Sequence, residues 1–306
     1  MTNYKLVIYD AGAGARAGIV VNDGVLDVAT SSGRGDSDSV CSLLEDWVAA
    51  KVRLSFLAAN SGGLPNRPLG SVKLLAPIDR PSAIYCAGAN YKDHVLEMAR
   101  SQNIAPEPDP HAAGLQSWHF IKAPGCVIGP NEIVHLPSRS NKVDWEAELA
   151  VVIGRTAKDV SVNAALAYVA GYTIANDLSA RDFTKRAAVP DSSPFKYDWV
   201  AHKCFDGSCP IGPWIVPAED IADPQNLAIE LSINGVIKQK SNTSQMIFTV
   251  AEQVSHLSGK LTLHPGDVIL TGTPAGVGAP RGVFLKANDK VRITVEGIGE
   301  LVNTIA

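Results

Sequence analysis

One strand-like segment limits the possible folds more than any other part of the chain. Residues 143–154 read VDWEAELAVVIG: acidic residues alternate at first, and the segment then becomes continuously apolar. A run of this kind is typical of a strand that is covered on both faces of its sheet. The segment therefore predicts a sheet packed on both sides, with carboxylates where the strand enters the core.

The rest of the chain favours short strands over long helices. The 26 glycines and 19 prolines mark frequent turns, which makes a helical bundle a poor candidate. We predict strands or strand pairs at residues 4–10, 16–28 (turning at Asn22–Asp23–Gly24), 171–175, 226–241 (turning at Asn234–Gly235), 266–272 and 290–306. We predict helices at residues 40–59, at 161–170 between Ser161 as N-cap and Gly171 as stop, and at 249–263.

A chain of 306 residues can form one large domain or two smaller ones. The best boundary is the segment SGGLPNRPLGS at residues 61–71, because glycine, proline, serine and asparagine dominate it. We therefore predict an α+β, mainly β protein, with a smaller N-terminal α/β domain over residues 1–75 and a catalytic domain over residues 76–306.

Composition excludes several classes of function. A net charge of −4 gives no basic excess to attract a phosphate backbone, so a nucleic-acid partner is not expected. No apolar run reaches the length of a membrane helix, and no secretory signal begins the chain. Five scattered cysteines without CxxC spacing fit a reduced, cytoplasmic location better than a disulfide scaffold.

The sharpest chemical feature is the acidic start of segment 143–154. Alternate residues of a strand share a face, so Asp144, Glu146 and Glu148 are expected to point the same way. Like charges that lose hydration repel one another, and a divalent cation such as Mg²⁺ or Mn²⁺ relieves both costs. The alternative is a solvated strand face with Lys142 nearby, and the spacing alone does not decide between the two.

Two other segments carry candidate site residues. Asp177, in the polar turn that follows the apolar strand GYTIA, is a candidate third metal ligand, although spacing alone favours an Asx-turn or helix N-cap. His94 and Glu97 lie three residues apart, so on a helix they would share a face as a general-base pair or as an exposed polar pair. The Pro-rich loop at residues 100–117 follows them and could close over a substrate.

The segment TGTPAGVG at residues 271–278 lacks both the P-loop and the dinucleotide-binding patterns. Its backbone N–H groups could hold a carboxylate, or it could be a simple turn after a strand. Lys122 and Lys203 are candidate cations for an anionic substrate, although each could be an ordinary surface lysine.

Taken in order, eight segments resemble the fumarylacetoacetate hydrolase family. They span about residues 77–303 and read NYKDHVLEM, FIKAPGCVIGP, DWEAELAVVIG, GYTIANDLSARDF, KCFDGSCPIGPWIV, INGVIKQKSNTSQMIF, LHPGDVILTGTPAGVG and VEGIGELVN. The resemblance implies a mixed β-sandwich-like roll for the catalytic domain, a homodimer, and Mg²⁺ or Mn²⁺ held by Glu146, Glu148 and Asp177.

The resemblance also implies roles for other residues. His94, oriented by Glu97, activates water or moves a proton, and Lys203 and Arg181 stabilise substrate oxygens. Lys122, Thr273 and Tyr91 are expected to contact the substrate in its pocket. Thr184 stands where the family often has glutamine, which places one substrate contact in question.

These implications predict a metal-dependent hydrolase that cleaves a C–C bond in an acylpyruvate-type 2,4-dioxo acid, such as a fumarylpyruvate, maleylpyruvate or fumarylacetoacetate analogue. The expected setting is the catabolism of aromatic compounds or sugar acids, and the expected partner is a small 2-oxo acid. One alternative on the same site is a decarboxylase or keto–enol tautomerase of an oxo-diacid such as oxaloacetate. An alternative of another class is a non-catalytic protein that binds metal and oxo acid.

Overall fold

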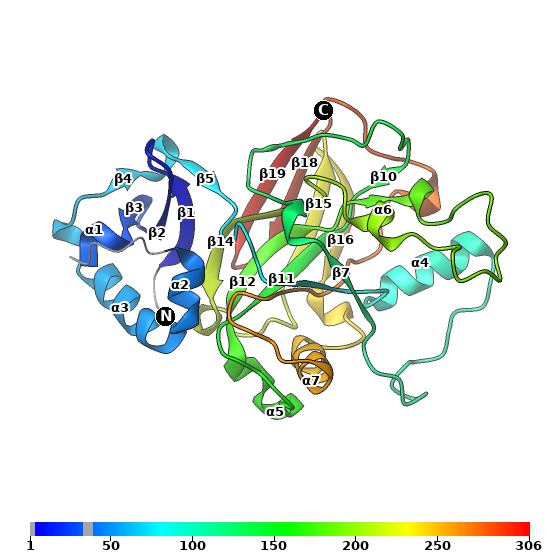
Figure 1. Cartoon of the computed structure of the whole chain (residues 1–306), viewed down its shortest axis with the longest axis horizontal. Helices are drawn as coiled ribbons and strands as arrows, with labels where there is room; N and C mark the ends of the chain where they lie inside the picture. Colours follow the sequence, from blue (N-terminus) through cyan, green and yellow to red (C-terminus); the bar gives the residue numbers. More distant parts are fainter. Residues whose placement is uncertain (1–3, 33–38) are drawn as a thin grey trace.

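The computed structural model describes residues 4–32 and 39–306, and strands dominate the described part (Figure 1). A twelve-stranded sheet has the order β4-β3-β2-β1-β14-β12-β11-β17-β6-β7, with β5 paired to β1 and β8 paired to β14. Its strands along the chain are β1 (Lys5–Asp10), β2 (Ala15–Val21), β3 (Gly24–Asp27), β4 (Arg67–Pro68), β5 (Lys73–Leu75), β6 (Ile84–Ala87), β7 (His119–Lys122), β8 (Val127–Ile128), β11 (Ala147–Ile153), β12 (Val169–Asn176), β14 (Cys209–Pro217) and β17 (Val268–Leu270).

A second sheet of five strands has the order β16-β15-β18-β19-β9, and a separate pair joins β10 to β13. These strands are β9 (Ile133–Val134), β10 (Val143–Asp144), β13 (Ser179–Ala180), β15 (Ala228–Ile233), β16 (Val236–Asn242), β18 (Lys290–Val295) and β19 (Gly299–Ile305). The strand-rich α+β architecture predicted from the sequence is therefore confirmed.

Strand β11 is covered on both faces, as its apolar run predicts. All of its residues are buried. Leu149 and Val151 belong to the apolar cluster that also contains the buried residues of β15, β18 and β19, whereas Ala150 and Val152 belong to a second cluster with β1 and α3. The strand is therefore the shared wall between two cores, which fixes its position and that of the carboxylates at its start.

The N-terminal unit lies at the left of Figure 1 and adds its strands to the large sheet, where Leu6 of β1 pairs with Ile215 of β14. Asn22 and Asp23 both have positive φ, as a two-residue hairpin turn between β2 and β3 requires. A single helix was expected at residues 40–59, but Asp46 ends one helix and accepts the Ala49 N–H of the next. The helices are α1 (Val28–Ser32), α2 (Val40–Glu45) and α3 (Trp47–Ala59). The domain boundary at residue 75 stays a prediction.

The helix predicted between Ser161 and Gly171 is wrong in length. Helix α5 (Val162–Ala165) is followed by the 3₁₀ turn η4 (Leu166–Tyr168), and β12 already begins at Val169. Gly171 lies inside β12, where an added Cβ would come within 2.3 Å of the Val216 carbonyl oxygen. The glycine therefore permits close approach of the neighbouring strand rather than ending a helix.

The remaining helices are α4 (Lys92–Gln102), α6 (Trp199–Lys203) and α7 (Val250–Lys260). Helix α7 begins with a capping box, in which Thr249 and Glu252 each accept the backbone N–H of the other, and it confirms the helix predicted there. The hairpin of β15 and β16 turns at Asn234 and Gly235, also as predicted. The 3₁₀ turns are η1 (Ser61–Gly63), η2 (Leu69–Ser71), η3 (Pro124–Cys126), η5 (Arg181–Phe183), η6 (Ala218–Asp220), η7 (Thr243–Gln245) and η8 (Ala279–Arg281).

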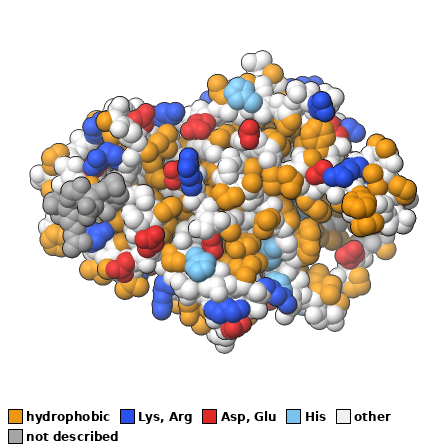
Figure 2. All heavy atoms as spheres, in the orientation of Figure 1, with side chains coloured by type: hydrophobic (Ala, Val, Ile, Leu, Met, Phe, Trp, Pro, Cys, Tyr) orange, Lys and Arg blue, Asp and Glu red, His pale blue; other side chains and the backbone are white. Residues whose placement is uncertain are grey.

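Among residues 4–32 and 39–306, none of the helices has the length and apolar character that crossing a membrane requires. Figure 2 shows acidic and basic side chains interspersed on one face of the molecule, with apolar side chains between them. That face carries no broad patch of a single charge sign, in keeping with the small net charge.

Candidate active site

Three buried carboxylates converge where two neighbouring strands meet. Glu146 directly precedes β11, Glu148 lies within β11, and Asp177 directly follows β12. Because Ala147 pairs with Asn176 across the two antiparallel strands, the acidic ends of both strands lie side by side. One carboxylate oxygen from each of the three side chains lies within 4.8 Å of the others. The sequence named these residues as metal ligands, and the fold brings them together.

Asp144 does not join this group, although strand alternation predicted that it would. The strand is interrupted between β10 and β11, so Asp144 turns toward residues 278–279. It accepts the backbone N–H groups of Gly278 at 2.6 Å and Ala279 at 3.0 Å, and the Arg181 guanidinium at 3.0 Å. Its lone pairs are therefore engaged by donors of the chain itself.

Three cations face the acidic cluster. Lys203 Nζ lies 2.8 Å from Glu146 Oε2 and 2.7 Å from Asp177 Oδ2, so its ammonium bridges the two carboxylates. Lys122 Nζ lies 2.7 Å from Asp177 Oδ1. Arg181 donates to Glu146 at 2.5 Å as well as to Asp144.

The balance of charge leaves Glu148 without a cationic partner among the described residues. Asp144, Glu146 and Asp177 each contact at least one of the three cations, whereas Glu148 accepts only the Gly272 N–H, at 2.6 Å. Burial, together with the carboxylates of Asp177 and Glu146, raises the pKa of Glu148 well above its usual range. The ionised form of Glu148 thus has no compensating cation among the described protein groups.

Glu146, in contrast to Glu148, has cationic neighbours that favour its ionised form. Burial alone would raise the pKa of Glu146, but the charges of Lys203 and Arg181 hold it well below its usual range. Burial would likewise lower the pKa of Lys203, yet the carboxylates of Asp177 and Glu146 raise it. The carboxylate and the ammonium therefore both stay charged.

This donor set suits a divalent cation. All three side chains offer carboxylate oxygens, which are hard ligands of the kind that Mg²⁺ and Mn²⁺ prefer. A dication near Glu148 would also offset the charge that the protein leaves uncompensated. Glu146, Glu148 and Asp177 are therefore the residues that would hold it, with the Lys203 ammonium directly beside the site.

A cavity of about 390 Å³ opens onto the acidic cluster. Its polar side is formed by Glu146, Glu148, His94, Arg181, Lys203 and Thr273. The other lining residues have aromatic or small side chains and are Trp118, Phe120, Trp199, His202 and residues 87–89. The sequence suggested only that aromatic residues near Trp118 and Trp199 could shape a pocket, and the fold places both rings 5.5 Å apart in the cavity lining.

His94 lines the cavity, but Glu97 does not orient it as predicted. Glu97 instead accepts the Arg281 guanidinium at 2.6 Å and the Gly276 N–H at 2.7 Å. The Nδ1 atom of His94 is buried and has no hydrogen-bond partner among the described residues. Burial lowers the pKa of His94, so the imidazole is neutral and available as a proton acceptor.

The loop at residues 271–279 binds carboxylates through its backbone N–H groups, as the sequence suggested. The carboxylates are side chains of the protein itself. Backbone N–H groups of this loop bind four acidic side chains of the chain itself. Gly272 binds Glu148, Ala275 binds Asp93, Gly276 binds Glu97, and Gly278 together with Ala279 binds Asp144. The glycines permit the backbone to turn its N–H groups inward, which is how the loop fixes the acidic framework.

Lys122 and Tyr91 take positions different from those predicted. The Lys122 side chain is fully buried behind Asp177 and does not line the cavity. Tyr91 is fully buried in an apolar cluster. Thr184 donates its hydroxyl to the Arg181 carbonyl at 3.0 Å, so it supports the backbone of that residue.

Two buried amides complete the site, and the sequence analysis missed both. Asn90 donates to the carbonyls of Phe248 and Thr271 and so ties the start of α4 to the 271–279 loop. Gln239 links the Ala147 N–H to the Thr273 hydroxyl. Single amides in a polar context carry no spacing signal, so only the fold reveals them.

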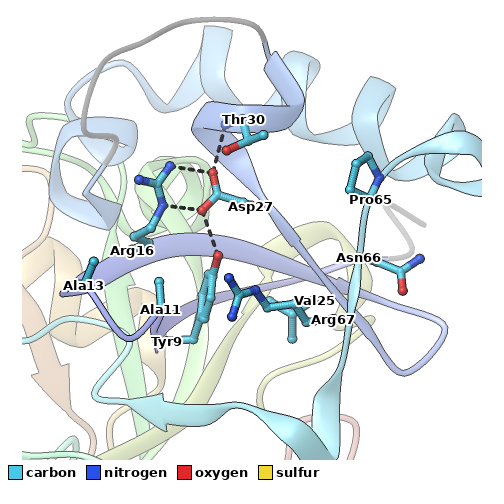
Figure 3. A pocket seen from close by; sticks show the side chains of 10 residues that line it. All are labelled: Tyr9, Ala11, Ala13, Arg16, Val25, Asp27, Thr30, Pro65, Asn66 and Arg67. Atoms are coloured by element: carbon cyan, nitrogen blue, oxygen red, sulfur yellow. Dashed lines mark hydrogen bonds and ion pairs between the residues drawn. The ribbon is translucent and has the colours of Figure 1, made fainter.

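A second cavity, of about 510 Å³, lies in the N-terminal unit (Figure 3). Its one carboxylate, Asp27, is already engaged by the Arg16 guanidinium, the Tyr9 hydroxyl and the Thr30 N–H. The N-terminal cavity is larger than the one at the acidic cluster, but its carboxylate is already paired with protein donors. The cavity at the acidic cluster is therefore the better candidate for the active site.

Comparison with known proteins identifies the family of the chain. The family model described as "Fumarylacetoacetate (FAA) hydrolase C-terminal" matches residues 83–306. The chain is 39% identical over 287 residues to "Oxaloacetate tautomerase Fahd2a, mitochondrial" of Rattus norvegicus, covering 93% of this chain and 85% of that protein. It is 41% identical over 244 residues to "Oxaloacetate tautomerase FAHD2A, mitochondrial" of Homo sapiens, covering 79% of this chain and 72% of that protein.

Both relatives are named as mitochondrial, and this finding overturns the expected cytoplasmic location. That expectation was wrong because it rested on cysteine spacing and on the lack of a recognisable signal. Neither feature reports the compartment of a chain whose relatives reside in an organelle.

Solved structures give the same answer for the fold. Maleylpyruvate hydrolase from Sphingobium sp. SYK-6, in complex with manganese(II) and pyruvate, superposes with a TM-score of 0.76 at 28% identity, covering 99% of this chain and 98% of that one. The 5-carboxymethyl-2-hydroxymuconate delta-isomerase from Mycobacterium smegmatis has a TM-score of 0.72 at 32% identity, with 99% of each chain covered. The fold, the acidic cluster and these similarities together establish that the chain belongs to the fumarylacetoacetate hydrolase family.

Proposed function

We propose that this enzyme interconverts the keto and enol forms of a 2-oxo diacid of the oxaloacetate type, with Mg²⁺ or Mn²⁺ at Glu146, Glu148 and Asp177. The observation that carries the proposal is the state of His94: a buried, neutral imidazole that faces the cavity while Glu97 is bound to Arg281. Keto–enol tautomerisation needs only a neutral base that moves a proton. Hydrolysis needs a base that activates water, and a carboxylate that orients the imidazole and stabilises its protonated form makes such a base more effective.

Each residue that lines the cavity has a separate role in the proposed tautomerisation. His94 is placed to take a proton from the carbon next to the 2-oxo group, and the same proton returns to the substrate at oxygen. Arg181 and Lys203 lie on the cavity wall, where their charges favour a dianionic substrate and the developing enolate. The divalent cation, when bound, supplies positive charge near the 2-oxo oxygen and so acidifies the neighbouring C–H.

The sequence-based prediction placed hydrolysis first and tautomerisation second. Relatives at 39–41% identity are named oxaloacetate tautomerases, which supports the second. C–C hydrolysis of an acylpyruvate remains the second candidate, because the maleylpyruvate hydrolase structure holds manganese and pyruvate on a similar fold. Both reactions pass through an enolate, so the same charged residues would serve either.

A product assay separates these reactions. Pure enol oxaloacetate is added with Mg²⁺ or Mn²⁺, and loss of the enol absorbance is followed while pyruvate and CO₂ are measured in parallel. Enol loss faster than the spontaneous rate without either product supports the proposal. Pyruvate and an acid released from 2,4-dioxo acids would favour hydrolysis, and CO₂ from oxaloacetate would favour decarboxylation.

A variant pair tests the base. His94→Ala should abolish turnover and leave divalent-metal binding intact, which also separates an enzyme from a protein that only binds metal and oxo acid. His264→Ala is the matched control, because His264 is exposed and lies outside the cavity. Full turnover by His94→Ala would remove His94 from the mechanism.

A further inference from the structure

Four aromatic side chains from two distant segments meet in the lining of the active-site cavity. Trp118 immediately precedes β7, which contains Phe120, and helix α6 contains Trp199 and His202. Neighbouring ring centroids lie 5.5–5.7 Å apart. Such separations fall within the range of about 4.5–7 Å at which aromatic rings attract one another. We call these four rings the aromatic cluster.

The positions of the two indole rings are fixed by the backbone around them. The Gly88 N–H donates to the Trp118 carbonyl at 3.0 Å, and a Cβ added to Gly88 would come within 2.0 Å of the Trp118 ring. Trp199 is the first residue of α6, and the N-cap Asp198 accepts the Ala201 N–H at 3.0 Å. Both rings are therefore held in place before a ligand arrives, which lowers the entropic cost of binding.

Both indole rings also keep open surface, although they line the cavity. Trp118 is 52% exposed and Trp199 is 40% exposed. A rigid aromatic face of this kind can stack on a planar ligand. The cavity volume of about 390 Å³ is large for a four-carbon diacid, since cavities of this size hold drug-sized ligands. The aromatic cluster thus offers a contact surface that oxaloacetate does not need.

The charged groups of the cavity lie away from the aromatic cluster's own polar content, which is small. Lys203 and Arg181 are bound to a carboxylate of the acidic cluster, and Lys203 Nζ lies 4.8 Å from the centroid of the Phe120 ring. The aromatic cluster therefore begins directly beside the charged groups. Burial, with the charges of Lys203 and Arg181, lowers the pKa of His202 to about 3, so this ring is neutral at pH 7. The aromatic cluster is suited to an uncharged part of a ligand.

We infer that the site also accepts 2-oxo acids that carry a planar aromatic arm on C3, and that Trp118 and Trp199 select this arm by stacking on it. The inference rests on the proposed function and extends its substrate class from oxo-diacids to arylpyruvates. The reaction remains an isomerisation. The C3–H bond breaks, the C2–C3 double bond forms, and the proton taken by His94 returns to the 2-oxo oxygen, so no group leaves and no co-reactant is consumed.

The test uses the whole protein with Mg²⁺ and two probes, phenylpyruvate and its saturated analogue cyclohexylpyruvate. Calorimetric titration should show that phenylpyruvate binds about 2- to 12-fold more tightly, because stacking adds to the burial that both rings share. Loss of the enol absorbance of phenylpyruvate should be faster than the spontaneous rate. Equal affinity for the two probes, or no binding of phenylpyruvate, would overturn the inference. This comparison needs no variant, so it is decisive even where a variant fails to fold.

Variants assign the selection to the two indole rings. Trp118→Leu and Trp199→Leu should each lower the ratio of kcat/KM for phenylpyruvate to kcat/KM for oxaloacetate by about 2- to 12-fold. Trp199→Phe should restore most of the ratio, because an aromatic face remains. Phe195→Leu is the matched control and should keep the wild-type ratio, since Phe195 is 70% exposed and does not line the cavity. A wild-type ratio in both leucine variants at positions 118 and 199 would contradict the selection by stacking.

Oxaloacetate turnover, measured on the same samples, keeps the two proposals apart. Preferential binding of phenylpyruvate without enol loss from either substrate supports the aromatic subsite and counts against the proposed function. Enol oxaloacetate loss in a protein that does not bind phenylpyruvate supports the proposed function and overturns the further inference alone.

Discussion

The carboxylate of Glu97 lies 2.6 Å from the guanidinium of Arg281, and this ion pair occupies the group that was expected to orient His94. Glu97 and His94 share helix α4, whereas Arg281 ends the turn η8 after the 271–279 loop. The pair therefore joins the helix that carries the base to the loop that holds the acidic framework. The ion pair positions helix α4, and its loss should affect turnover more than the free energy of unfolding.

Arg281→Gln is expected to change turnover more than stability. The Arg281 side chain is 47% exposed, so loss of the ion pair should cost about 1 kcal/mol or less of unfolding free energy. Turnover should change because Glu97 is then held only by the Gly276 N–H, and α4 loses one of its contacts with the segment after β17. Thermal denaturation and steady-state kinetics on the same preparation check this, and an unchanged kcat would show that α4 is positioned without Arg281.

Removal of the metal is expected to abolish activity. Chelation should remove the dication from three carboxylates, and Mg²⁺ or Mn²⁺ should restore activity better than Zn²⁺ because all the ligands are hard oxygens. Activity assays with graded metal additions after dialysis test this. Full activity in the presence of chelator would contradict the metal-dependent part of the proposal.

Lys203→Met is expected to tighten binding of the divalent cation while it impairs turnover. The Lys203 ammonium bridges Glu146 and Asp177, so it repels a dication at this site. When no metal is bound, it offsets part of the negative charge of both carboxylates. The metal-free variant should lose about 3–5 kcal/mol of stability, because a buried ion pair is broken. Calorimetric titration with Mn²⁺ and denaturant unfolding with and without metal measure both effects. Weaker Mn²⁺ binding would show that Lys203 supports the metal site.

Stability is expected to fall on acidification through His202. Burial and the positive charges of Lys203 and Arg181 lower the pKa of His202 to about 3. The unfolded chain takes up this proton near pH 6.5 and the folded one does not, so the contribution is complete above about pH 6.5. It falls as the pH drops toward 3, by about 1.4 kcal/mol per pH unit.

Denaturant unfolding between pH 4 and pH 8 measures this slope. His202→Phe should flatten it, because the aromatic ring remains beside Trp199 but no proton binds. The exposed control His264→Gln should keep the wild-type slope. Equal slopes for His202→Phe and the wild type would assign the acid sensitivity to other groups.

The sequence by itself determined the parts that local pattern controls. The apolar part of segment 143–154 specified a strand buried on both faces, Asn234–Gly235 specified a hairpin turn, and the amphipathic pattern of residues 249–263 specified a helix. These features depend on neighbouring residues, and the sequence displays them directly. The pattern alone put Asp144 beside Glu146 and Glu148 and left Asp177 open, and the resemblance to the fumarylacetoacetate hydrolase family selected Glu146, Glu148 and Asp177.

Only the tertiary structure decided which charges meet. Each carboxylate is bound by residues from a distant segment of the chain. Arg281 pairs with Glu97, the backbone N–H groups of residues 278–279 bind Asp144, and Lys122 pairs with Asp177. No spacing rule ranks such partners, because the strength of a contact depends on distance and burial in the folded chain. Gly171 shows the same limit for the backbone, since the close approach of Val216 O that requires a glycine exists only once the sheet has formed.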